Sequence, residues 1–377
     1  MKKNLFFGLA LLIGIPAVLQ SQSEENPQAL FMLGARYHRG FIIQHTEKLK
    51  EEITQSNPWC IEMDVNWHLR KRNVWEYCYC YPRTGFSVMY TNFDLPEVLG
   101  SAVSVYSFIE PYIRADKKLS FSFRFGLGPA FLTKVYDENS NPDNLFFSSH
   151  LSFVALLNFA GNYRLTDQLF FRLAGNFNHI SNAGYSEPNL GMNFPSVNLG
   201  FDYYFGKRQF YHREKVHEPE SKPAKNRFDF TMALAAKPTT SGIHAKRYPV
   251  YGLGIIYSRV TGRIMALAAG MEWVNDLSIR EHIREINMTD PSGNYPDHNR
   301  IGTLAGIEWL FGRFIFYQQL GYYIYSPVKA NNIFYQRYGL NFKINNYFFV
   351  GVNIKAHGQD ADFMDIRTGF SWKNIRK

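Results

Sequence analysis

Residues 196–205 read SVNLGFDYYF, a segment in which polar or small residues alternate with the apolar residues Val197, Leu199, Phe201, Tyr203 and Phe205. Residues 119–127, LSFSFRFGL, repeat the alternation. A period of two predicts β-strands with one apolar face and one polar face. Several such segments extend for about ten residues or more, the length that a tilted strand needs to cross a bilayer, whereas strands of globular domains average about five or six. The pattern therefore favours a membrane β-barrel that ends on an aromatic residue.

The alternation predicts an all-β chain with two sets of eight strands. The first set lies near 31–44, 59–70, 84–93, 98–114, 118–134, 148–164, 168–180 and 195–205, and the second near 227–237, 248–260, 262–275, 300–311, 313–325, 330–344, 347–357 and 363–373. The polar, proline-containing segment between them reads as a linker. We therefore expect two tandem antiparallel up-and-down barrels of the outer membrane, at residues 30–205 and 227–377, joined by a linker at 206–226. One sixteen-stranded barrel is the alternative.

Composition and the N-terminus agree with a membrane barrel. Aromatic residues make up 17% of the 377 residues and charged residues only 19%, whereas about a quarter of a soluble domain is charged. Basic residues at 2–3 and the apolar run Leu5–Leu19 predict a signal peptide at residues 1–21, and hence export to the outer membrane. The net charge of +9 then points to anionic lipid head groups rather than nucleic acid as partner.

The three cysteines are an odd number for an oxidising compartment. Read as a strand, residues 78–80 place Cys78 and Cys80 on one face, so that Cys60 is able to bridge to either. No second ligand pair accompanies them, so the pattern argues against a metal site. We assign these cysteines no catalytic role.

The segments 178–184 (NHISNAG) and 187–193 (EPNLGMN) carry the candidate chemistry. His179 and Ser181, two residues apart on an extended strand, point to the same side about 7 Å apart along it. A serine becomes a nucleophile when a base lies beside it and a third group orients that base. The turn that follows offers an amide side chain at Asn182 and the backbone N–H groups of Ala183 and Gly184, which are the parts of an oxyanion hole.

The parity of the strand places this pair on the apolar face. Leu173, Gly175 and Phe177 precede His179 and Ser181 at every second position. In a barrel with a polar lumen this is the face in contact with lipid, where polar side chains are costly to keep without a use. We therefore expect a hydrolase whose substrate is a membrane lipid.

The string HISNAG…PNLGMN before the last strand of an eight-stranded pattern resembles the signature of the PagL-type lipid A 3-O-deacylases, called acyloxyacyl hydrolases in some relatives. The resemblance covers about residues 30–205. It implies an eight-stranded outer-membrane barrel that removes an ester-linked acyl chain from lipid A, or lipopolysaccharide, without metal or cofactor. It also implies that Ser181 is the nucleophile, His179 the general base, and Asn182 with the neighbouring backbone the oxyanion hole.

One position departs from the family pattern. Asn193 stands where the family carries a glutamate that orients the histidine. An asparagine can hold an imidazole by a hydrogen bond but cannot stabilise the imidazolium by charge. We take Asn193 as the orienting residue, with Glu187 in the turn as the alternative. The departure also keeps open a non-enzymatic structural or lipid-binding barrel, and an esterase that acts on phospholipid fits the same pattern.

The second half lacks the nucleophile. His357 follows Phe348-Phe349 as His179 follows Phe170-Phe171, but Gln359 stands in the position of the serine. The alternation places His357 on the polar face. We therefore expect the second barrel to be non-catalytic, and the oligomeric state is left open.

Overall fold

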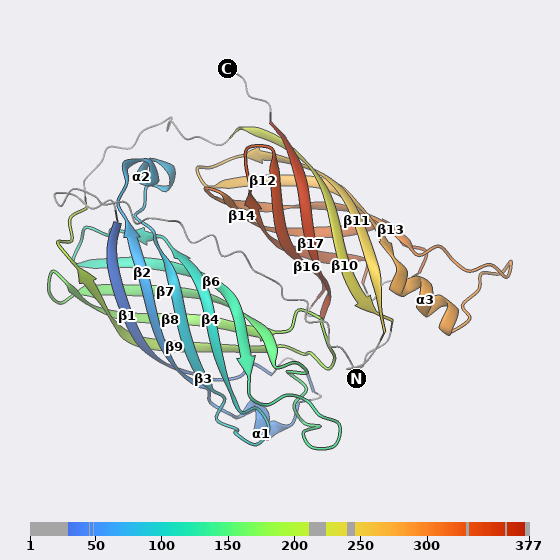
Figure 1. Cartoon of the computed structure of the whole chain (residues 1–377), viewed down its shortest axis with the longest axis horizontal. Helices are drawn as coiled ribbons and strands as arrows, with labels where there is room; N and C mark the ends of the chain where they lie inside the picture. The colour runs from blue at the N-terminus through green and yellow to red at the C-terminus, as the bar shows by residue number, and fades with distance from the viewer. Residues whose placement is uncertain are drawn as a thin grey trace, which may run out of the picture.

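The protein folds into two closed antiparallel barrels that lie side by side (Figure 1). The computed structural model describes residues 29–44, 46–47, 49–210, 224–239, 246–328, 332–358 and 360–373. The expected signal peptide at 1–21 and residues 211–223 of the expected linker lie outside the described residues.

The first barrel is built from residues 29–205. Its strands are β1 (Ala29–Gly40), β2 (Trp59–Leu69), β3 (Arg83–Asn92), β4 (Ser101–Glu110), β5 (Tyr112–Ile113), β6 (Leu119–Leu132), β7 (Leu151–Arg164), β8 (Leu169–Ser181) and β9 (Met192–Phe205). Pairing of β1 with β9 and of β4 with β6 closes the ring, and β5 is a two-residue strand beside β6. Eight long strands therefore form this barrel.

The second barrel begins after the linker. Its strands are β10 (Asn226–Pro238), β11 (Arg247–Val260), β12 (Met265–Asp276), β13 (Asn299–Phe311), β14 (Phe314–Tyr325), β15 (Phe334–Lys343), β16 (Phe348–His357) and β17 (Asp360–Lys373). β10 pairs with β17, so this sheet closes on itself. The fold class is confirmed, and the alternative of one sixteen-stranded barrel is wrong because each half forms its own ring.

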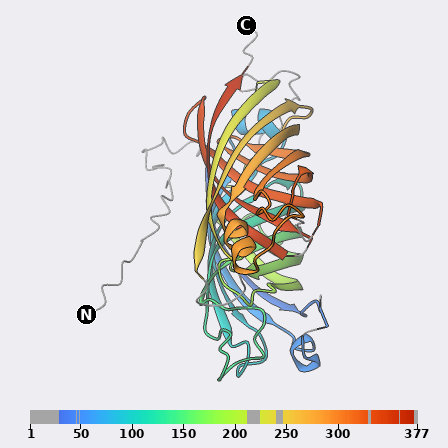
Figure 2. The same ribbon diagram turned by 90° about the vertical axis from the view of Figure 1, so that its right-hand side faces the viewer.

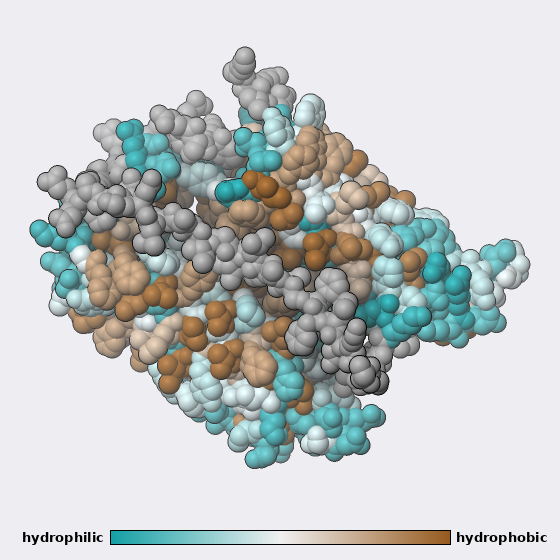
Figure 3. Space-filling view, in the orientation of Figure 1, coloured by the Kyte–Doolittle hydropathy of each residue, from teal (hydrophilic) through white to brown (hydrophobic). Residues whose placement is uncertain are grey.

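The alternation along each strand separates an apolar outside from a polar inside. On β9, Leu199 and Phe201 are each 51% exposed, whereas Asn198 and Asp202 are 0% and 1% exposed. Figure 3 shows hydrophobic residues gathered over the barrel walls and hydrophilic residues over the loops around α1 and α3. The apolar walls suit contact with bilayer hydrocarbon, and closure leaves no unpaired strand edge in it.

The lumen of the first barrel is filled by paired charges. Four arginines and four carboxylates form a connected set of buried ion pairs: Arg36, Arg83, Arg124 and Arg172 with Glu62, Asp64, Glu110 and Asp202. An eight-stranded barrel has an interior just wide enough for side chains to fill. Each charge meets an opposite charge, which offsets the cost of removing it from water.

Among the described residues, three short helices lie outside the walls: α1 (Glu51–Thr54), α2 (Arg72–Cys78) and α3 (Leu277–Glu285). Strand periodicity did not predict them. α3 occupies part of the polar segment Asp276–Asn299, where the Asp276 carboxylate accepts from the N–H groups of Ser278 and Ile279 and so caps the helix. Within the described ranges, no helix has the length and apolarity needed to cross a bilayer.

The cysteines correct one expectation. Residues 72–78 form α2 rather than a strand, and Cys78 is bonded to Cys80. Cys60 is free and buried at the opposite end of β2. A bridge from Cys60 to either partner is therefore wrong, because nearly the whole height of the barrel separates them.

The two barrels touch at both ends and between the ends. Near α2, the Tyr77 hydroxyl donates to the Leu310 carbonyl at 3.0 Å. The rings of Phe125, midway along β6, and Phe316, near the start of β14, lie 5.2 Å apart, and at the far end the Arg247 guanidinium lies 4.2 Å from the centre of the Tyr185 ring. The first strand of each barrel begins at the α2 end, so the two barrels have the same orientation (Figure 1). Figure 2 shows the second barrel in front of the first.

Candidate active site

Adjacent strands place the candidate residues side by side. His179 and Ser181 lie at the end of β8, and the antiparallel register sets His179 directly opposite Asn193 on β9. All three are half-buried members of the outward-facing set of their strands. The structure thus brings Ser181, His179 and Asn193 together on the apolar exterior wall.

The three side chains form a continuous hydrogen-bonded chain. His179 Nε2 lies 3.0 Å from Ser181 Oγ, and His179 Nδ1 lies 2.7 Å from Asn193 Oδ1. When Nδ1 carries the proton and donates it to the Asn193 carbonyl oxygen, Nε2 is left to accept the proton of Ser181. This is the arrangement of a nucleophile, its base and the group that orients the base.

The turn after β8 supplies backbone donors. Ala183 and Gly184 both have positive φ angles, of 56° and 76°. The Ala183 N–H donates to Ser181 Oγ at 3.4 Å. A backbone N–H so close to the nucleophile stands where it can meet the charge that develops on an attacked carbonyl oxygen.

The Asn182 side chain has other partners. Its Nδ2 donates to the Ser186 carbonyl at 2.8 Å and to Ser148 Oγ at 3.1 Å, and its backbone N–H donates to Asn189 Oδ1 at 3.1 Å. Both side-chain N–H donors are therefore engaged within the protein. In this geometry Asn182 holds the loop in place, and the donors nearest the nucleophile come from the backbone.

The alternative orienting residue, Glu187, is engaged within its loop. Its Oε2 accepts from the Asn189 N–H at 2.9 Å. The imidazole Nδ1 meets Asn193 instead. The geometry thus favours Asn193 over Glu187 as the group that orients His179.

Gly191 is part of the site and was not singled out from the sequence. Its φ is +64°, and a Cβ there would lie 3.0 Å from His179 Cε1 and 3.2 Å from the Cβ of Ser181. Any side chain at this position would press on the imidazole. In the sequence this residue is only a glycine two positions before Asn193. Its importance becomes clear in the fold, where the loop returns over His179 and leaves no room for a side chain.

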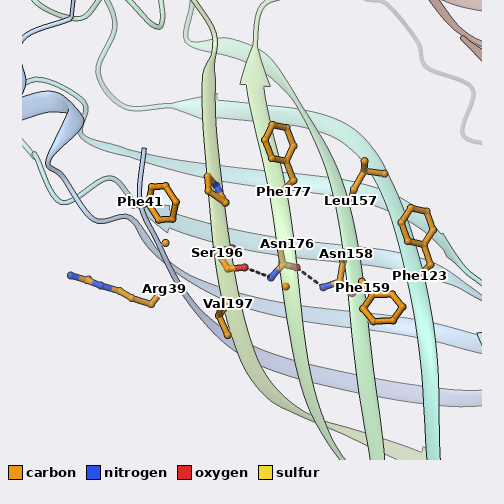
Figure 4. A pocket seen from close by; sticks show the side chains of 13 residues that line it. Arg39, Phe41, Phe123, Leu157, Asn158, Phe159, Asn176, Phe177, Ser196 and Val197 are labelled. Atoms are coloured by element: carbon orange, nitrogen blue, oxygen red, sulfur yellow. Dashed lines mark hydrogen bonds between the residues drawn. The ribbon is translucent and has the colours of Figure 1, made fainter. Parts of the chain in front are cut away.

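An apolar groove lies on the outer wall near these residues (Figure 4). The groove encloses about 470 Å³. Its lining includes Gly175 and Phe177, which precede His179 on β8 by four and two residues. Gly175 lies between Phe159 and Val197 on the neighbouring strands, and a Cβ placed on it would meet nothing within 4 Å. Beneath it, Asn176 contacts Asn158 and the Ser196 carbonyl. The missing side chain therefore makes a depression in the wall.

The second barrel differs at the equivalent histidine. His357 Nε2 lies 3.1 Å from the Tyr323 hydroxyl, which belongs to the buried set of the lumen. Gln359 lies outside the described residues. No group of three or more His, Cys, Asp or Glu side chains placed to hold a metal ion occurs in the described part of either barrel.

Two family models match the chain. Residues 61–202 match the lipid A 3-O-deacylase (PagL) family, and residues 226–374 match the acyloxyacyl hydrolase C-terminal domain. No curated protein sequence matches significantly.

Solved structures of membrane barrels are also similar to the chain. The crystal structure of the outer membrane enzyme PagL is 13% identical, with 44% of this chain and 97% of that chain covered and a TM-score of 0.33. A Rhodopseudomonas blastica porin triple mutant is 7% identical, with 91% and 100% covered and a TM-score of 0.19. At these values the likeness carries no argument about activity.

Proposed function

We propose that this chain, whose first barrel matches the lipid A 3-O-deacylase (PagL) family and whose second matches the acyloxyacyl hydrolase C-terminal domain, is an outer-membrane serine esterase that removes an ester-linked acyl chain from lipid A. The observation that carries the proposal is the hydrogen-bonded chain Ser181–His179–Asn193 on the apolar outer wall. A nucleophile on this wall is within reach of a substrate dissolved in the bilayer.

The reaction follows from the roles of these groups. Ser181 Oγ attacks the ester carbonyl while His179 Nε2 takes its proton, and the Ala183 N–H stabilises the oxyanion. His179 then gives the proton to the leaving lipid hydroxyl, so that the acyl group remains on Ser181. Water, deprotonated by the same imidazole, releases the fatty acid and restores the serine.

The position of Ser181 along the barrel supports lipid A as the substrate. Outer-membrane barrels have short periplasmic turns and longer external loops. Residues 165–168 form a short turn at the α2 end of the first barrel, whereas the segments 133–150 and 182–191 connect strands at the other end. Ser181 lies at that long-loop end, the end that meets the external leaflet, where lipid A resides.

A direct assay separates lipid A from phospholipid as substrate. We expect purified full-length protein to release a 3-hydroxy fatty acid from lipid A micelles, and to release fatty acid at least about tenfold more slowly from phosphatidylethanolamine, which has no hydroxyacyl ester at the corresponding position. Mass spectrometry of both products measures the ratio. Equal rates, or faster hydrolysis of phosphatidylethanolamine, would contradict the choice of lipid A.

The groove beside His179 fits an acyl chain. From His179 to Gly175 is four residues along β8, or roughly 13 Å at about 3.3 Å per residue. An acyl chain whose carbonyl meets Ser181 is thus able to lie over Phe177 and settle in the depression at Gly175. We propose that the groove binds the acyl chain that is cleaved.

Gly175→Leu tests this role of the groove. We expect kcat/KM for long acyl chains to fall about threefold to tenfold, with short chains unaffected. The effect is modest because the displaced methylenes lose packing contacts but remain in hydrocarbon rather than entering water. Gly161→Leu is the matched control, because Gly161 also faces outward and has open space around it, but it does not line the groove. If kcat/KM depends on acyl-chain length in the same way in the two variants, the groove does not bind the cleaved acyl chain.

A further inference from the structure

A second groove runs between the two barrels at the end that holds α2. It encloses about 1170 Å³. Residues of α2 and the nearby ends of β2 and β4 form one side, including Leu69, Tyr77 and Ile109. The other side comes from the ends of strands in the second barrel. The hydrogen bond from Tyr77 to Leu310 joins the two sides.

The second barrel lines this groove with cations. They are Lys225, Arg259, Lys343 and Lys373, and no aspartate or glutamate is among the lining residues. Neighbouring strand ends bring them together, since Arg259 pairs with Asn226 and Lys373 with Arg227 in the β-sheet. Across the portion of the chain that the structure describes, no side chain of the four lies within 4.0 Å of a carboxylate, and the Lys343 ammonium donates to the Gly312 carbonyl at 3.1 Å. The groove lining therefore carries four cations and no carboxylate, and Asp229 of the adjacent lumen offsets only part of the charge of Lys343 and Lys373.

The walls of the groove are apolar at the level of the barrel ends. Leu69, Ile109, Ile264 and Phe311 line it, together with the ring of Tyr347. Both walls are outer faces of barrels, which in a bilayer are in contact with lipid. A ligand that fits has an anionic group for the cations and a hydrocarbon portion for the walls.

We propose that this groove is a binding site for one glycerophospholipid with an anionic head group, held between the barrels in the leaflet at the α2 end. The head-group phosphate meets Arg259, Lys343 and Lys373, and the acyl chains lie against Leu69 and Ile109. A zwitterionic phospholipid is the poorer ligand, because its ammonium group finds no carboxylate in the lining. The lipid contacts both barrels and so stabilises their association. It is distinct from the substrate, since Ser181 lies at the opposite end of the first barrel.

Lipid retention tests the proposal. Full-length protein is reconstituted in vesicles of phosphatidylethanolamine and phosphatidylglycerol, re-extracted in mild detergent, and examined by native mass spectrometry. We expect about one phosphatidylglycerol per chain to remain bound, in excess over phosphatidylethanolamine. In Lys343→Gln/Lys373→Gln the affinity falls roughly 30-fold, since each basic side chain near an anionic lipid contributes roughly fivefold.

The matched control is Lys117→Gln/Lys118→Gln. These residues precede β6 at the same end of the first barrel but do not line the groove. This variant should retain phosphatidylglycerol like the unaltered protein. Equal retention of the two phospholipids, or undiminished retention in Lys343→Gln/Lys373→Gln, would overturn the proposal. Either result leaves the esterase assignment untouched, because hydrolysis of lipid A is measured separately.

Discussion

We expect Ser181→Ala to lower the rate of acyl release from lipid A by roughly 10⁴-fold or more, because Ser181 is the group that forms the acyl-enzyme in the proposed mechanism. His179→Ala gives a loss of the same order, since Ser181 Oγ then has no base at 3.0 Å. The double variant is no slower than either single variant, because residues that act as one unit are not additive. Mass spectrometry of the released 3-hydroxy fatty acid over long incubations measures the residual rate.

Ser149→Ala is the matched control for the loss of a hydroxyl. Ser149 lies in the loop before β7, where its hydroxyl donates to the Leu151 carbonyl, outside the catalytic chain. Its rate should stay within about twofold of the unaltered protein. All variants should keep the heat-modifiable electrophoretic mobility of a folded barrel. Release that persists in Ser181→Ala would reject the serine mechanism even if the protein hydrolyses lipid A.

Replacement of Asn193 separates a weakened enzyme from a barrel without activity. Asn193→Leu removes the oxygen that lies 2.7 Å from His179 Nδ1, so the imidazole loses its orientation and kcat falls by roughly 10²-fold or more. Asn193→Asp keeps an oxygen in the same place and adds a negative charge that stabilises the imidazolium formed during attack. We expect kcat to rise by roughly tenfold, measured with lipid A under the same conditions.

The double variant Ser181→Ala/Asn193→Asp shows whether the rise in kcat expected for Asn193→Asp depends on Ser181 as the nucleophile. This variant should be as inactive as Ser181→Ala alone. If Asn193→Asp and Asn193→Glu both leave the rate unchanged while Asn193→Leu is also fully active, the orienting role of residue 193 is wrong. If all forms are inactive on lipid A, a binding or structural barrel becomes the better interpretation.

The strands were predictable because the environment of a barrel wall is simple. Residues on β9 such as Asn198 and Leu199 face either a crowded polar lumen or hydrocarbon, so the residue type itself reports the face. The helices were not predictable from the alternation, because they lie in connecting segments that do not have one face toward a polar lumen and the other toward hydrocarbon. Cys78 illustrates this, since reading it as a strand residue led to a disulfide partner at the wrong end of β2.

The site was only partly predictable. His179 and Ser181 share a strand, so their parity places them on one face without knowledge of the fold. Asn193 joins them only through the register of β8 with β9, and there the family resemblance supplied what spacing did not. Gly191 and the groove at Gly175 depend on how a loop returns and on which side chains flank a position in adjacent strands. Neither the path of the loop nor the neighbours across adjacent strands can be predicted from the local sequence.

The charge-filled lumen of the first barrel has a consequence for the cell envelope. Arg83, Arg124 and Arg172 are almost completely shielded from solvent, and their carboxylate partners lock them in place. A hydrophilic antibiotic or a hydrated ion that reached this barrel would have to break several of these ion pairs to pass. A cell can therefore insert many copies of the first barrel without making its outer membrane more permeable, because the proposed catalytic residues lie on the outer wall and ion pairs fill the lumen.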